Sequence, residues 1–198
     1  QDIRDIVAYA SSRHMEIIPE IDMPGHFSAA IKVYPELSCT GDAGWGNEFS
    51  YPICPSKPEN YEFVKNIIDE VIAIFPSDYF HIGADEVEMD NWEQCRVCRQ
   101  LMQQEGYQSV NDLHNRFVKI MTDYLKSKGK KVLGWDDAFH EAEPQDLIYT
   151  YWRDWLPDQP SKITQKGFPI IFTEWSRFYL SAKPSDEALS SLYNFEFE

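Results

Sequence analysis

The sequence from residue 79 to residue 87 is Tyr79-Phe80-His81-Ile82-Gly83-Ala84-Asp85-Glu86-Val87. Its apolar first half is typical of a short buried strand, and two acids follow almost at once. Neighbouring side chains of a regular strand point to opposite faces. Asp85 and Glu86 can therefore share a pocket only if the chain has left the strand and entered the loop at its carboxyl end. Parallel α/β folds place their chemistry at this end of the sheet.

Two carboxyl groups in one cleft tend to titrate apart, so that one stays ionised while the other holds a proton near neutral pH. Asp85 and Glu86 would then have the equipment of a glycosidase. The alternative is a solvated turn, because acids are common where strands end. The pair alone does not decide between these interpretations.

The rest of the chain alternates between helical and strand-like patterns. Helical spacing follows Asp2 and recurs over 61–75, 110–124 and 161–166, and Ser56 with Glu59 predicts a capping box. Strands are predicted at 15–21, 79–83, 131–135, 147–152 and 168–173. This alternation predicts a parallel sheet. There is no repeat or linker, so residues 1–198 are predicted to form a single domain.

Polar or aromatic residues follow the carboxyl end of each predicted strand. They are Glu20, Asp22 and His26; Asp85 and Glu86; Trp135, Asp136 and Asp137; Trp152 and Arg153; Glu174, Trp175 and Tyr179. An open, doubly wound sheet concentrates its site at one switch point, whereas a (β/α)8 barrel gathers it from many strands. The even spread favours a TIM barrel. Because a complete barrel has eight strands, the predicted barrel is incomplete, short by about three.

Composition limits the partners. The net charge of -15 argues against nucleic acid or an anionic membrane as the main partner. No apolar window approaches the length of a membrane span. Aromatic residues make up 15% of the chain, which suits either sugar-binding faces or an aromatic core. We expect a soluble protein with a small neutral or cationic ligand.

Four cysteines are present. Cys39 and Cys54 flank a glycine- and aromatic-rich loop, which a disulfide could close in an oxidising compartment. Cys95 and Cys98 form a lone Cys-x-x-Cys, and a zinc site needs two more ligands, but no second such pair exists. A structural or unpaired role is therefore predicted, with no metal and no cofactor. The chain opens directly in a helical pattern, so any targeting segment is expected to have been removed.

Three motifs, in this order, carry a specific resemblance. They are Ile18-Pro19-Glu20-Ile21-Asp22-Met23-Pro24-Gly25-His26, His81-Ile82-Gly83-Ala84-Asp85-Glu86-Val87 and Gly134-Trp135-Asp136-Asp137. Together they resemble the β-N-acetylhexosaminidases of glycoside hydrolase family 20. The resemblance covers nearly the whole chain and implies strands three to seven of that family's catalytic barrel. The cysteines resemble those of secreted bacterial members, which implies a secreted, periplasmic or cell-surface location.

The resemblance implies a substrate-assisted, retaining mechanism on glycans that end in β-linked N-acetylglucosamine or N-acetylgalactosamine. The substrate's 2-acetamido oxygen attacks the anomeric carbon and gives an oxazolinium intermediate. By motif match, Glu86 is the general acid and then the base, and Asp85 orients the acetamido N–H. His26 matches the histidine that helps to set the proton affinity of Glu86; without the motif, a loop hydrogen bond would be the ordinary interpretation.

Further residues match the walls of the acetamido pocket. Trp135 and Trp152 match aromatic walls, with a core role as the rival for Trp152, and Tyr179 matches the tyrosine that bonds the acetamido carbonyl. Asp22 and Glu20 are expected to shape the rim.

Asp136 and Asp137 either contribute to that rim or cap the following segment. Members commonly have aspartate where this chain has Ser181, which puts sugar affinity in doubt.

The family's arginine on the first strand and its tryptophan and glutamate on the eighth have no counterpart here. The chain is therefore expected to bind substrate poorly by itself, as a fragment of a longer enzyme or as a chain that self-associates through unpaired sheet edges. A non-catalytic sugar-binding or structural fragment is the alternative from another class. A metal hydrolase that uses Glu20, Asp22, His26 and Asp85 is a third, although no recognised ligand pair is present.

Overall fold

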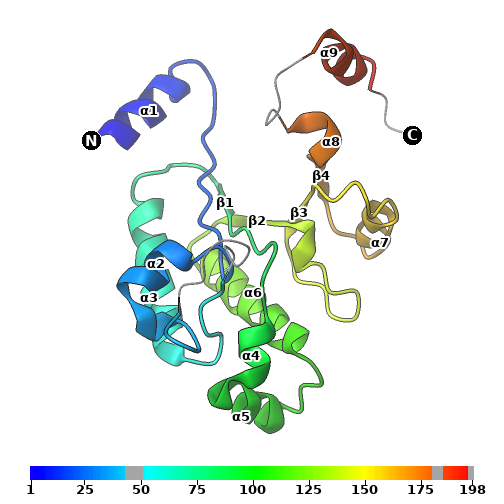
Figure 1. Ribbon diagram of the computed structural model, residues 1–198. Helices are drawn as coiled ribbons and strands as arrows, with labels where there is room; N and C mark the ends of the chain where they lie inside the picture. Colours follow the sequence, from blue (N-terminus) through cyan, green and yellow to red (C-terminus); the bar gives the residue numbers. More distant parts are fainter. Residues whose placement is uncertain (43–50, 180–184, 196–198) are drawn as a thin grey trace.

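The computed structural model describes residues 1–42, 51–179 and 185–195. Its centre is a parallel sheet of four strands in the order β1-β2-β3-β4 (Figure 1). The strands are β1 Tyr79–His81, β2 Lys131–Trp135, β3 Ile148–Tyr151 and β4 Ile170–Phe172. Every neighbouring pair is parallel, so all four carboxyl ends reach one edge of the sheet. The predicted α/β class and parallel sheet are confirmed.

Helices and helical turns connect and flank these strands. They are α1 Asp2–Ser11, α2 Ser28–Val33, η1 Pro35–Leu37, α3 Pro58–Ile72, α4 Asp90–Gln94, α5 Arg96–Glu105, α6 Val110–Ser127, η2 Asp136–Ala138, α7 Gln159–Gln165, α8 Trp175–Phe178 and α9 Asp186–Tyr193. None of the described helices is both long and apolar enough to cross a bilayer.

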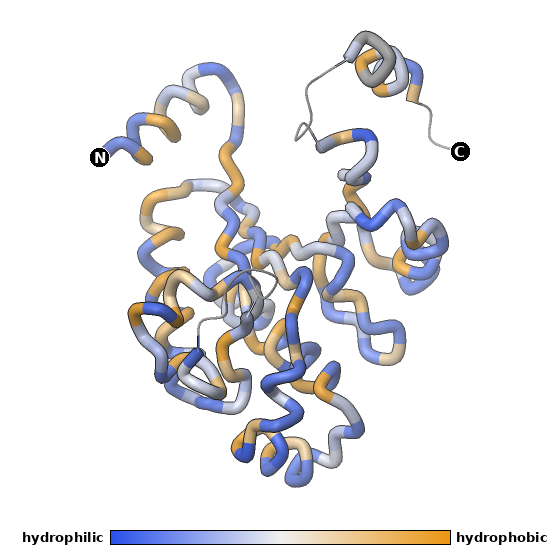
Figure 2. Tube along the Cα trace, in the orientation of Figure 1, coloured by the Kyte–Doolittle hydropathy of each residue, from blue (hydrophilic) through white to orange (hydrophobic). Residues whose placement is uncertain are grey.

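The main core lies between α3, α6 and the sheet. Ile68 of α3 and Phe117 and Met121 of α6 are fully buried in the same cluster as Phe80 and Val132 of the first two strands. These helical residues recur every three to four positions, so each helix turns one apolar stripe to the strands. Figure 2 shows the apolar colour gathered along the strands and the inner sides of the helices.

The strand predicted at 15–21 is wrong as a buried strand. It makes one parallel bridge, between Glu20 and His81, and Met15 and Ile18 are 54% and 41% exposed. Pro19 has no N–H to donate, so the pairing uses its carbonyl, which accepts from His81 N at 2.9 Å. No described strand lies on the outer side of this segment, which leaves it as one edge of the sheet.

The capping box predicted at Ser56 is also wrong. Helix α3 begins at Pro58, whose fixed φ suits a first helical position. The box occurs instead at the start of α6, where Ser109 and Asp112 cap each other reciprocally. Ser56 Oγ is buried and has no hydrogen-bond partner among the described residues.

Candidate active site

The loop after β1 turns both acids into one cavity. Gly83, Ala84 and Glu86 have positive φ values of 68°, 71° and 47°, so the chain leaves strand geometry here. Asp85 Oδ2 lies 3.6 Å and Glu86 Oε2 lies 3.2 Å from the same atom, Nε2 of His26. The structure thus brings together the three residues that the motifs had singled out.

The segment that ends in His26 is locked against this loop. Asp22 Oδ1 accepts a hydrogen bond of 3.0 Å from Ala84 N, and Asp22 Oδ2 lies 3.9 Å from His26 Nε2. A Cβ atom on Gly83 would lie 1.9 Å from Asp22 Oδ1. This close approach, together with the positive φ, explains why glycine occupies position 83.

The pKa values of Asp22, His26 and Asp85 depend on one another. A hydrogen bond with Asp85 is the main cause that raises the pKa of His26, to about 9. Burial alone would raise the pKa of Asp85, but hydrogen bonds from His26 and Asp22 bring it below its usual value. Burial, and then the Asp85 charge, raise the pKa of Asp22 to about 8. At neutral pH, Asp85 is therefore ionised and Asp22 protonated, so the split that was predicted for Asp85 and Glu86 is seen between Asp85 and Asp22.

Aromatic side chains wall the cavity, whose volume is about 410 Å³. Its lining residues are Glu20, Asp22, His26, Asp85, Glu86, Trp135, Trp152, Trp175 and Tyr179. Trp135 Nε1 donates to Glu20 Oε1 at 3.0 Å, and Trp152 stacks on Tyr179 with 6.4 Å between ring centroids. All of the predicted aromatic residues thus face one space. Ser181 lies outside the described residues.

Asp136 and Asp137 hold the Trp152 wall in place. Asp136 is fully buried beneath the cavity lining and accepts from Trp152 N at 3.0 Å and from Arg153 Nε at 2.8 Å. Asp137 Oδ2 accepts from the Trp152 indole N–H at 2.8 Å, and its Oδ1 accepts a long bond of 3.4 Å from Glu86 N. Both acids therefore act on the position of Trp152, and Asp137 links it to the acid loop.

His81 is a support of the site that the sequence reasoning missed. Gly83 N donates to its Nδ1 at 3.0 Å, so Nε2 carries the proton and donates to Thr150 Oγ1 at 2.9 Å. Burial lowers the pKa of His81 to about 4. The imidazole is therefore neutral, and its 3.4 Å approach to Glu20 is not an ion pair. Its ring packs against Trp135, with centroids 4.9 Å apart.

Trp175 also lines the cavity; the sequence placed it after a predicted strand, but no role was assigned to it. It follows β4 in the same way that Trp135 and Trp152 follow their strands, and this position was the signal that could have identified it.

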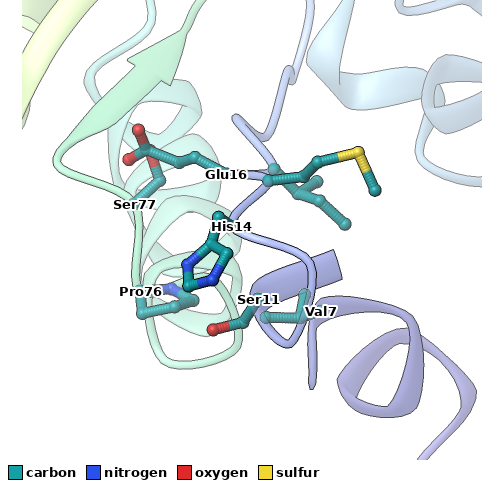
Figure 3. Close-up of a pocket in the computed structure, with 8 residues that line it drawn as sticks. Val7, Ser11, His14, Glu16, Pro76 and Ser77 are labelled. Atoms are coloured by element: carbon teal, nitrogen blue, oxygen red, sulfur yellow. The ribbon is translucent and has the colours of Figure 1, made fainter. Parts of the chain in front are cut away.

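A second cavity, of about 320 Å³, lies at the opposite end of β1 between the end of α1 and the turn before the strand (Figure 3). Glu16 accepts there from the Ser77 hydroxyl at 2.7 Å. That hydrogen bond anchors the 15–21 segment. No pair of acids lies among the residues that line this cavity.

The expectations for the cysteines need correction. All four are free thiols, so Cys39 and Cys54 form no disulfide. Cys39, Cys54, Cys95 and Cys98 nevertheless lie together, with all four sulfur atoms within 4.8 Å of one another. The missing second pair of ligands is therefore present; it was overlooked because its members are far apart in sequence, and a backbone bond from Cys54 N to Leu37 O brings them together. Ligand atoms of Asp22, His26 and Asp85 are equally close.

The chain matches the family described as glycosyl hydrolase family 20, catalytic domain, over residues 1–196. It is 37% identical over 158 residues to a β-hexosaminidase of Porphyromonas gingivalis, covering 77% of this chain and 20% of that protein. It is 36% identical over 188 residues to a β-hexosaminidase of Vibrio furnissii, covering 91% and 30%.

Solved structures agree. The chain is similar to the family 20 exo-β-N-acetylglucosaminidase of Vibrio harveyi solved in complex with N-acetylglucosamine, with a TM-score of 0.80 and 32% identity over 98% of this chain. It covers 33% of that protein. The chain thus spans between a fifth and two fifths of the length of these relatives, and its sheet is a portion of their TIM barrel.

Proposed function

This chain belongs to glycoside hydrolase family 20, and on that premise we propose that it forms the acid-bearing part of a barrel that hydrolyses terminal β-linked N-acetylhexosamine from glycans. The cavity supports this proposal through its adjacent acids and its aromatic wall. Pyranose rings present apolar C–H faces that suit such a wall. Both N-acetylglucosamine and N-acetylgalactosamine fit the proposal.

The observation that carries the proposal is an unused oxygen on Asp85. Its Oδ1 is buried and accepts no hydrogen bond from any described residue, although Asp85 is ionised. A buried acceptor without a donor is costly. The N–H of a bound 2-acetamido group would supply that donor. Asp85 would then orient the amide so that its carbonyl oxygen faces the anomeric carbon.

Glu86 is placed to move the proton. In the proposed reaction the acetamido oxygen forms a bond to the anomeric carbon as the glycosidic bond breaks, and the Glu86 carboxyl protonates the leaving oxygen. The products of this step are an oxazolinium ring and the free alcohol. Glu86 then takes a proton from water as the water oxygen forms a bond to the anomeric carbon. The bond from that carbon to the acetamido oxygen breaks, which opens the ring and restores the sugar with retention. General acid catalysis of this kind contributes about 10²–10⁴ in rate.

The other residues have positioning or binding roles in this proposal. His26 lies between the two acids, and its Nε2 holds the Glu86 carboxyl at 3.2 Å, beside Asp85. Trp135, Trp152 and Tyr179 enclose the acetamido group, with the Tyr179 hydroxyl on its carbonyl. Asp22 shapes the rim. Asp136, being buried, acts on substrate only through Trp152.

The test replaces Glu86 with glutamine and measures turnover of an aryl N-acetyl-β-hexosaminide, with this chain carried in a complete barrel. We expect kcat to fall by about 10²–10⁴. Glu62→Gln, at an exposed side chain on α3, is the matched control and should retain full turnover. Near-normal turnover of the Glu86 variant would reject the proposal.

One alternative is a sugar-binding or structural fragment without turnover. Binding of N-acetylglucosamine by the isolated chain, without hydrolysis, would select it. The Asp22, His26 and Asp85 cluster keeps a metal hydrolase open as another. Metal content measured on an Asp85→Asn variant distinguishes the metal hydrolase from our proposal. Our proposal requires the variant to bind as much metal as the parent chain.

We also propose export to the periplasm, the cell surface or the medium, as the resemblance of the cysteines to those of secreted bacterial members implies. Cell fractionation followed by immunodetection tests this. Recovery of the protein only in the cytoplasm would reject it.

A further inference from the structure

Three separate segments bring four thiols to one point, outside the lining of the acid cavity. Cys39 follows η1, Cys54 precedes α3, and Cys95 and Cys98 begin α5. Cys98 Sγ lies 3.7 Å from Cys39 Sγ and 3.6 Å from Cys54 Sγ. These separations far exceed the roughly 2.05 Å of a disulfide bond. All four sulfur atoms lie within 4.8 Å of one another, so no pair stands apart from the group.

The spacing fits a tetrahedral metal ion. Four thiolates bound at a zinc–sulfur distance of about 2.3 Å lie about 3.8 Å from one another. The two sulfur–sulfur distances at Cys98, 3.6 Å and 3.7 Å, are close to that value. We propose that Cys39, Cys54, Cys95 and Cys98 bind one zinc ion in a closed, structural site.

The surroundings suit a negatively charged centre. Cys95 is the N-cap residue of α5 and makes no side-chain capping bond, and Cys98 lies in the first turn. The free N–H groups and dipole at a helix N-terminus favour thiolates. Lys57 Nζ donates to the carbonyls of Glu36 and Ser38 at 2.6 Å and 2.9 Å, which brings a positive charge beside Cys39.

Half of the site is fully shielded from water, and Cys39 and Cys95 are partly buried. Cys54 and Cys98 are fully buried, in a cluster with the equally buried Trp92 and Leu113. The Trp92 indole donates to Ile53 O at 3.2 Å, and Asn60 Nδ2 donates to Cys54 O at 2.9 Å. These bonds fix the backbone on both sides of Cys54. A coordination shell supported in this way has the character of a structural site, without an open position for substrate.

The metal would connect the two segments that carry the acid cavity. The chain reaches Cys39 soon after His26, and it reaches Cys95 soon after Glu86. Val87, next to Glu86, also packs against the cysteine cluster, so a shared ion would brace the histidine segment against the acid loop. This role is separate from the chemistry proposed for Glu86, and the test needs no measurement of turnover.

The test measures metal in the purified chain after reduction, zinc loading and desalting. We expect one zinc per chain by elemental mass spectrometry, and the cobalt-substituted chain should show the thiolate charge-transfer and d–d bands of a tetrahedral tetrathiolate. A thiol-specific mercurial should release the zinc as it titrates four thiols, which tests the unmutated chain directly. Cys54→Ser and Cys98→Ser should each abolish the tetrathiolate spectrum.

Leu101→Ala is the matched control, because Leu101 packs on the same cluster without offering a ligand. It should retain one zinc per chain. Zinc content no higher than that of the Cys98→Ser variant would overturn the proposal. A chain mass that reveals a disulfide among these cysteines after reduction and zinc loading, or iron in place of zinc, would overturn it as well.

Discussion

At the scale of single residues, the acid loop depends on positions where the backbone and a neighbouring side chain nearly touch. Gly83 passes over Asp22 at a distance that excludes any Cβ atom. Asp22 in turn holds its proton next to the Asp85 charge. The geometry of the cavity thus depends on the absence of a side chain at Gly83 and on the protonated carboxyl group of Asp22.

Gly83→Ala should destabilise the chain by roughly 2–5 kcal/mol, because the methyl group meets Asp22 and the φ of 68° is strained for alanine. Gly129→Ala is the matched control, since Gly129 also has a positive φ, of 80°, but nothing lies within 4 Å of its added Cβ. It should cost only about 1–2 kcal/mol. Urea unfolding measures both, and equal losses would contradict the close-contact argument.

Stability should fall as pH rises through the range set by Asp22 and His26. Folding raises the pKa of His26 from 6.5 to about 9 and that of Asp22 from 3.8 to about 8, so the folded chain binds more protons than the unfolded chain. The His26 contribution is complete below pH 6.5 and is lost towards pH 9. The cost of ionising Asp22 grows with pH until about pH 8.

Asp22→Asn removes the Asp22 part of this dependence. Its stability relative to the parent should therefore increase between pH 5 and pH 8, by roughly 1–3 kcal/mol. Urea unfolding at intervals across this range measures the difference, with Asp5→Asn on the exposed helix α1 as the baseline. A difference that stays constant with pH would show that Asp22 ionises normally.

At the scale of elements, the loops after β2 and β3 depend on each other. Arg153, after β3, binds the buried Asp136, after β2, and both position Trp152. Asp136 is fully buried, and Arg153 Nε lies 2.8 Å from its Oδ2. The Arg153–Asp136 ion pair is thus largely buried, whereas the ion pair between Lys119 and Asp123 on α6 is exposed to solvent.

Arg153→Met should cost about 3–5 kcal/mol, because it leaves the Asp136 carboxylate buried without its cation. Lys119→Met is the matched control, since Lys119 and Asp123 pair on the exposed face of α6. It should leave stability nearly unchanged, because solvent screens the exposed pair. Thermal unfolding followed by near-UV circular dichroism, which senses Trp152, reports both effects; similar losses would contradict the assigned role of burial.

The elements that could be predicted from sequence are those with strong periodicity. The stripe of α6 and the apolar run of β2 determine their own types, and the residue pattern after each strand located most of the cavity. The 15–21 segment was misassigned because its apolar residues belong to an exposed edge, which a pattern of hydrophobicity cannot distinguish from a core strand. His81 and the four thiols depend on contacts between distant segments, so no local spacing could reveal them.

At the scale of the whole molecule, apolar surface remains exposed beside the sheet edge. Ile3, Ile6 and Tyr9 of α1 are 49%, 59% and 59% exposed, and Ile18 on the edge segment is 41% exposed. Figure 2 shows apolar colour along α1 and the segment after it. Such a surface favours association.

The isolated chain should therefore show concentration-dependent association in sedimentation velocity experiments. Ile18→Lys should weaken it, because a charge on an edge opposes pairing. Val33→Lys on α2 is the matched control, since Val33 is 67% exposed but belongs to a helix and not to the edge segment 15–21. A chain that remains monomeric at all concentrations, or equal weakening by both changes, would contradict this expectation.

The two outer borders of the sheet, along residues 15–21 and along β4, have a consequence for engineering. Neither pairs on its outer side with a described strand. Strands of a related barrel, expressed as an independent polypeptide, could form backbone hydrogen bonds with these two borders. Two-piece reconstitution, followed by recovery of a fluorogenic signal, would turn this sheet into a split reporter whose halves are inactive until they meet.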